Sequence, residues 1–131
     1  VRMPMFELSP AGLLKLNAAG EPAGEPVDYL QVPGTDPAHC FGCKCTSRID
    51  LGHGLVSSPG TIFVFSYEEF PEDNNIVLCP LGAEAMLGRV YLFNRGNRVV
   101  LEPSDPSRAP IVLDCPIQDS GYRLIARYEY F

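Results

Sequence analysis

The sequence predicts a mainly β domain built from short, twisted and partly closed sheets. Its 131 residues include 13 prolines and 12 glycines, which favour short strands and tight turns over long helices. Runs rich in β-branched and aromatic residues recur at short intervals, with no convincing amphipathic helix between them. Hydrophobic residues make up 46% of the chain, which is enough for a packed core and predicts one folded domain.

The first 26 residues are expected to form a mobile linker. The tetrapeptide Ala-Gly-Glu-Pro occurs twice in succession, at 19–22 and 23–26. Small residues beside prolines resist helix formation and leave an extended, accessible backbone.

From Tyr29 onwards the pattern is that of strands bounded by turn residues. The runs 85–93 and 98–101 are expected to pair as a hairpin, because the glycine-containing loop Asn94-Arg95-Gly96-Asn97 joins them. The strands are expected at 29–32, 61–67, 75–79, 85–93, 98–101, 111–113 and 122–131.

Charge and hydropathy exclude two classes of function for this segment. The net charge is −6 and no Lys/Arg cluster is present, so the segment is not expected to bind nucleic acid by itself. No apolar run is long enough to span a bilayer and no signal-peptide pattern occurs, which indicates a cytoplasmic protein with no membrane partner. The five cysteines are therefore expected to be reduced.

Five short motifs occur in an informative order along residues 18–131. They are the two Ala-Gly pairs Ala19-Gly20 and Ala23-Gly24, then Cys45-Thr46-Ser47-Arg48, Ser58-Pro59-Gly60-Thr61, Met86-Leu87-Gly88-Arg89-Val90, and the run from Val99 to Asp105. In this order they resemble the C-terminal domain of LexA-type and phage CI-type repressors, the self-cleaving S24 peptidases. The resemblance implies a LexA/signal-peptidase-like fold.

The resemblance also implies that a catalytic residue is missing. Family members cleave an Ala-Gly or Cys-Gly bond with a serine, which matches Ser47, and a lysine, whose position is held here by Gly88. A serine hydroxyl needs a base to take its proton, and glycine has no side chain to do so. Arg89 stays protonated and, as the next residue of a strand, points to the opposite face.

The expected function is therefore assembly without catalysis. Residues 27–131 would form the dimerisation domain of a phage or prophage repressor, as a homodimer or larger homo-oligomer. A separate N-terminal helix-turn-helix domain would contact operator DNA, and an antirepressor protein would relieve repression in place of self-cleavage.

Two alternatives concern the same site. An active serine self-peptidase would need another base, for which His39 and His53 are the candidates. Alternatively, Gly88 is an engineered substitution that traps an uncleaved form.

Cys40-Phe41-Gly42-Cys43 suggests a zinc site, with Cys45, His39 and His53 as further candidate ligands. No second Cys-x-x-Cys exists. The family resemblance implies a strand that begins near Phe41, on which Cys43 and Cys45 would share one face as small core residues. Free thiols are expected, with no metal or other cofactor.

The terminal run is expected to form the dimer interface. A strand dense in aromatic and aliphatic side chains exposes both apolar area and unpaired backbone groups, which an isologous contact would cover. Leu124, Ala126 and Tyr128 would lie on one face, with Ile125, Arg127 and Glu129 on the other. The interface residues are expected to be Tyr122, Leu124, Ile125, Ala126, Arg127, Tyr128 and Tyr130.

Overall fold

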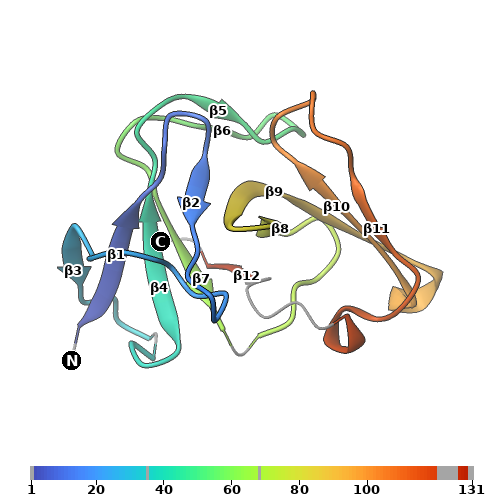
Figure 1. Cartoon of the computed structure of the whole chain (residues 1–131), viewed down its shortest axis with the longest axis horizontal. Coiled ribbons are helices and arrows are strands. Elements are labelled where there is room, and N and C mark those ends of the chain that lie inside the picture. Colours follow the sequence, from blue (N-terminus) through green and yellow to red (C-terminus); the bar gives the residue numbers. More distant parts are fainter. Residues whose placement is uncertain (1, 35, 68, 121–126, 130–131) are drawn as a thin grey trace.

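The computed structural model describes residues 2–34, 36–67, 69–120 and 127–129, and it confirms the predicted mainly β class (Figure 1). Over these residues the strands form three sheets, none of which is closed. The described residues contain no helix with the length and apolarity that crossing a membrane requires.

The first sheet brings together strands from both ends of the chain. Its strand order is β12-β7-β4-β1-β3, and all neighbours are antiparallel except the parallel pair β1 and β4. The parallel pair places a strand from the start of the chain in the interior of the sheet. The strands are β1 (Met3–Glu7), β3 (Asp28–Leu30), β4 (Cys40–Lys44), β7 (Ile62–Ser66) and β12 (Arg127–Glu129).

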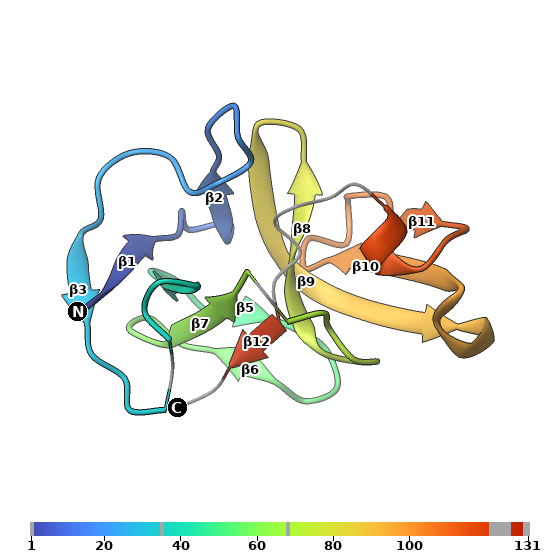
Figure 2. The ribbon, with the colours of Figure 1, turned by 90° about the horizontal axis from the view of Figure 1, so that it is seen from below.

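The second sheet is organised around its longest strand, β9 (Glu84–Phe93). Its order is β11-β10-β9-β2, and β8 also pairs with β9, so β9 contacts three strands along its length. Figure 2 shows β9 running beside β8 before it continues along β10. The remaining strands are β2 (Leu13–Lys15), β8 (Ile76–Leu81), β10 (Arg98–Pro103) and β11 (Ile111–Leu113), and β5 (Ile49–Asp50) with β6 (Val56–Ser57) forms a separate small sheet.

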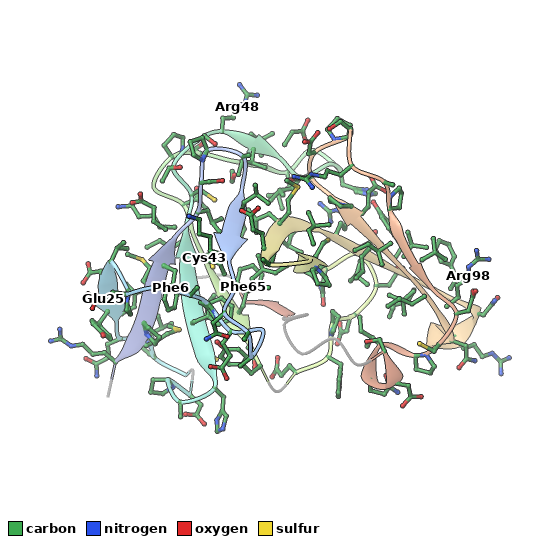
Figure 3. The ribbon with its side chains drawn as sticks, viewed as in Figure 1. Phe6, Glu25, Cys43, Arg48, Phe65 and Arg98 are labelled. Carbon is green, nitrogen blue, oxygen red and sulfur yellow. The ribbon has the colours of Figure 1, made fainter. Side chains whose placement is uncertain are left out.

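Alternation along β4 determines which side chains enter the main core. Phe41, Cys43 and the following Cys45 are fully buried in the large apolar cluster, whereas Cys40 faces a smaller cluster with Met3. The prediction that Cys43 and Cys45 share a face as core residues is confirmed. Figure 3 shows Phe6, Cys43 and Phe65, from β1, β4 and β7, gathered in this core, while Arg48 and Arg98 point outward from the periphery.

The prediction that residues 1–26 form a mobile linker is wrong for the first half of this range. β1 pairs with both β3 and β4, and β2 pairs with β9, so 3–15 is an integral part of two sheets. Met3, Met5, Phe6, Leu8 and Leu14 are buried. The apolar residues in this region form only short alternating runs, interrupted by prolines. Such runs do not differ clearly from a random scatter of apolar residues, so the sequence pattern did not predict these strands.

The later strand predictions are largely confirmed. The hairpin of β9 and β10 forms as expected, and its loop is the 3-10 turn η1 (Asn94–Gly96), in which Arg95 has a positive φ of 59°. The predicted strand 29–32 is displaced to Asp28–Leu30, because its partner β1 begins at Met3, the residue that pairs with Leu30. A second 3-10 turn, η2 (Ile117–Asp119), places the buried Ile117 under β10 and β9 residues of the second core cluster.

The burial of β1 predicts a large cost for truncating its aromatic side chain. Phe6 contacts Phe41 edge-on, with ring centroids 6.3 Å apart, and belongs to the main cluster. Phe6→Ala is expected to lower the free energy of unfolding by about 3 kcal/mol, measured by urea denaturation. Glu7→Ala, at an exposed position of the same strand, is the control and should change it by less than about 0.5 kcal/mol. An unchanged free energy of unfolding in Phe6→Ala would contradict the placement of β1 in the fold.

Candidate functional site

Ser47 lies in the turn between β4 and β5, where it is bound to the opposite chain segment. Its hydroxyl donates a hydrogen bond to the carbonyl of Pro10, and the adjacent Thr46 hydroxyl donates to the carbonyl of Leu8 at 3.0 Å. Together these bonds fix the turn after β4 against the connection between β1 and β2. The Ser47 oxygen is therefore held by a carbonyl acceptor, which is not a group that could remove its proton.

Gly88 lies in the middle of β9, where three strands approach closely. It pairs with Val77 of β8 on one side and with Pro103 of β10 on the other. A Cβ atom at this position would lie 2.5 Å from Cys79 Sγ and closer still to the carbonyl oxygen of Glu102. Backbone atoms cannot move aside as a flexible side chain can, so even a methyl group does not fit here without a shift of β10.

The thiol of Cys79 fills the volume that a side chain at position 88 would need. Cys79 is fully buried in the second core cluster with Val77, Val90 and Leu101. Burial, with a smaller contribution from the charge of Glu102, raises the pKa of Cys79 to about 12. The group facing Gly88 is therefore a neutral thiol in an apolar cluster.

Arg89 has a buried guanidinium that binds backbone carbonyls from two loops. Nε and Nη2 donate to the carbonyl of Leu51 at 3.1 and 2.8 Å, and Nη2 also donates to that of Gly52 at 3.2 Å. Nη1 donates to the carbonyl of Asn74 at 2.7 Å. These bonds satisfy a cation that would otherwise be costly to bury, and they hold the 51–52 loop against β9.

A pocket of about 420 Å³ opens where this loop, β9 and the segment after β10 meet. Gly88 and Arg89 form part of its wall, but Ser47 is not among its lining residues. The other lining residues are Asp50, Leu51, Gly52, His53, Tyr91, Glu102, Pro103, Ser104 and Pro106.

The two candidate bases each contact a group other than Ser47. His53 Nε2 lies 3.1 Å from the hydroxyl of Tyr91 at the pocket, and His39 Nδ1 lies 2.7 Å from Asp36 Oδ2. The hydrogen bond from His39 lowers the pKa of Asp36. Neither contact gives the Ser47 hydroxyl a proton acceptor.

The cysteine pair that suggested zinc does not converge. Cys40 and Cys43 lie three residues apart on β4 and enter different apolar clusters on opposite faces of the sheet. Burial raises the pKa of the Cys43 and Cys45 thiols, which disfavours the thiolate form that binds metal. In the described part of the chain, no three His, Cys, Asp or Glu side chains are grouped as metal ligands.

The first Ala-Gly pair lies in a closed turn after β2. The Asn17 side chain accepts hydrogen bonds from the backbone N–H groups of Ala19 and Glu21, and Gly20 adopts a positive φ of 78°. Ala23 N–H donates to the carbonyl of Lys15, and Gly24 follows with a φ of 83°. The region is exposed but tied down by its own hydrogen bonds, so it is not the extended linker that the composition predicted.

The predicted interface falls mostly beyond what the structure describes. Tyr122, Leu124, Ile125, Ala126 and Tyr130 lie outside the described residues, and at Arg127 and Tyr128 only the backbone is described. That backbone, β12, pairs antiparallel with β7 and is the last strand of the first sheet over the described residues.

Sequence reasoning missed the Arg89 anchor and the pocket around it. Arg89 lies among the apolar residues Leu87 and Val90 of this strand, and that pattern is the signal that could have suggested a buried cation. Gly52-His53-Gly54 is a second signal, because all three residues adopt positive φ angles and so form a sharp loop beside the pocket.

The close approach at Gly88 predicts an unusual cost for the smallest possible substitution. Gly88→Ala should lower the free energy of unfolding by about 2–3 kcal/mol, because the new methyl group meets backbone and a buried sulfur. Gly42→Ala is the matched control on β4, where a Cβ would meet only side-chain atoms at its shortest contacts, Leu30 Cδ1 at 3.1 Å and Met5 Cγ at 3.4 Å. Its cost, by the same urea titration, should stay below about 1 kcal/mol. Equal costs at the two positions would refute the packing argument.

Comparison with known proteins gives one informative match. No family model matches the chain. The chain is 34% identical over 123 residues to a LexA repressor from Anaeromyxobacter sp. (strain Fw109-5). The alignment covers 84% of this chain and 51% of the relative, so the chain spans about half the length of the curated relative it matches. The similarity, together with the mainly β fold, supports a LexA-like family for this chain.

Proposed function

We propose that this chain is the assembly domain of a LexA-like transcriptional repressor that does not cleave itself. The observation that carries the proposal is the 34% identity to a LexA repressor over most of the chain. The full repressor would be a cytoplasmic protein that contacts operator DNA through a separate N-terminal helix-turn-helix domain. The net charge of −6 on this chain is consistent with leaving DNA contact to another segment.

The loss of self-cleavage is proposed from three features of the site. The Ser47 hydroxyl already donates to the Pro10 carbonyl, and Gly88 supplies no base where the family resemblance places a lysine. The volume beside Gly88 is taken by Cys79 and by backbone of β10. Without a base, a serine hydroxyl is a poor nucleophile at neutral pH, so the Ala-Gly bonds should persist.

Self-cleavage can be tested directly at alkaline pH, where a lysine base would lose its proton. The protein is expected to stay intact on prolonged incubation, as measured by intact-mass spectrometry. The Ser47→Ala variant is the control and should behave identically. A fragment beginning at Gly20 or Gly24 that forms in the wild type and disappears in Ser47→Ala would contradict the proposal and favour the serine self-peptidase.

Assembly follows from how such repressors bind their operators. Two recognition helices must enter successive major grooves about 34 Å apart, which requires the two chains to be held together. The end of the chain is the proposed contact, because β12 borders the first sheet in the described region and the flanking sequence is rich in aromatic and aliphatic residues. An isologous pairing would cover that edge.

The oligomeric state tests this part of the proposal. The wild type is expected to be a dimer at micromolar concentrations by light scattering with size-exclusion chromatography. Ile125→Lys and Tyr128→Lys should each give a monomer, because a charge in an apolar contact opposes association. Val112→Lys, at an exposed position of the other sheet, is the control and should remain dimeric. A monomeric wild type would refute the assembly role.

The finer assignment is that the repressor belongs to a phage or prophage and that a protein antirepressor relieves repression. It rests on the same missing base: if self-cleavage cannot separate the two domains, another event must end repression. We propose that this event is the binding of a partner protein to this domain, which does not require the chain to be cut.

A further inference from the structure

A second pocket, of about 640 Å³, lies away from Gly88 and combines aromatic rings with a carboxylate. Three separate segments form it: the turn after β2, the segment before β4 and the segment after β7. In Figure 1 these segments meet below β2, β4 and β7. The lining residues are Ala19, Gly20, Glu21, Ala38, His39, Tyr67 and Phe70.

Both aromatic rings of the wall are exposed to solvent, and the Tyr67 ring also packs against the core. Phe70 is 60% exposed and Tyr67 is 39% exposed, so both rings present area to solvent. The Tyr67 ring packs on the buried Phe41 with centroids 5.1 Å apart. Burial and the nearby charge of Glu21 raise the pKa of Tyr67, so its ring carries a neutral phenol at physiological pH.

The charge around the rings is negative. Glu21 belongs to the wall, and Asp36 is bound to two lining residues, to His39 at 2.7 Å and to the backbone N–H of Ala38 at 3.0 Å. No lysine or arginine occurs among the described lining residues. An aromatic surface beside a carboxylate attracts a cation through the ring quadrupole and through charge.

We propose that this pocket is an interaction surface that binds an arginine side chain of a partner protein. The planar guanidinium would stack on Phe70 and Tyr67 and pair with Glu21, while its aliphatic stem covers the apolar wall. This goes beyond the assembly role, because the pocket includes neither Ser47 nor the C-terminal strand. Since Ala19 and Gly20 form part of the wall, an occupant would also hold the turn that contains the first Ala-Gly pair.

The probe for this surface is Nα-acetyl-L-arginine amide, titrated into the isotope-labelled protein and followed by NMR. Shifts are expected to concentrate on the amides of Ala19 and Gly20 and on the ring signals of Tyr67 and Phe70. Nα-acetyl-L-citrulline amide has the same shape without the charge, and it should give shifts at least about threefold weaker at equal concentration. Equal responses to the two probes would overturn the proposal.

Single substitutions distinguish binding of the arginine probe in this pocket from its nonspecific electrostatic attraction to an acidic protein. Glu21→Gln and Phe70→Ser should each raise the dissociation constant of the arginine probe about threefold or more. Glu25→Gln and Val112→Ser remove a charge and an exposed apolar group elsewhere and should leave it unchanged. Amide spectra check that each variant is folded. Equal weakening by Glu21→Gln and Glu25→Gln, or no weakening by Phe70→Ser, would overturn the proposal.

Discussion

The architecture depends on β9, a strand that serves two cores at once. Ala85 and Leu87 point into the large cluster formed with the first sheet, whereas Val90 points into the smaller cluster under β8 and β10. Between them, Gly88 lets β8 and β10 approach from both sides. A strand buried on both faces tolerates few changes, because any added atom must displace a neighbour that is itself packed.

The sequence predicted the strands well wherever apolar residues formed continuous runs. Thr61–Tyr67 and Ala85–Phe93 are examples, and both correspond to strands of the fold. It failed for Met3–Glu7, since that strand contains Pro4 and becomes recognisable only through its pairing with the distant β4. Pairing between segments far apart in the chain leaves no local signal for periodicity to detect.

The sequence singled out Ser47 and Gly88 as candidate site residues but not the contacts around them. Position 88 was identified from the order of the motifs, and Arg89 was expected on the opposite face of the strand. The sequence could not predict that Cys79 and the Glu102 carbonyl fill the space beside Gly88, nor that the Ser47 hydroxyl is bound to Pro10. These contacts depend on distances between segments that are far apart in sequence. The contacts at the Glu102 and Pro10 carbonyls also involve backbone atoms, whose positions cannot be predicted from residue type.

Under the proposed function, the packing around Gly88 opposes a lysine at this position. A lysine needs a cavity lined so that its amine can stay neutral beside the serine, yet here the space is closed by a sulfur and a carbonyl oxygen. Removing Cys79 would clear only one of these contacts, because the carbonyl belongs to β10 and moves only with that strand. A longer side chain at position 88 would therefore require β10 to move outward, which would disturb the apolar contacts of Leu101 and Val99. Gly88→Lys alone is therefore expected to disturb the packing of the three strands rather than to place an amine beside Ser47.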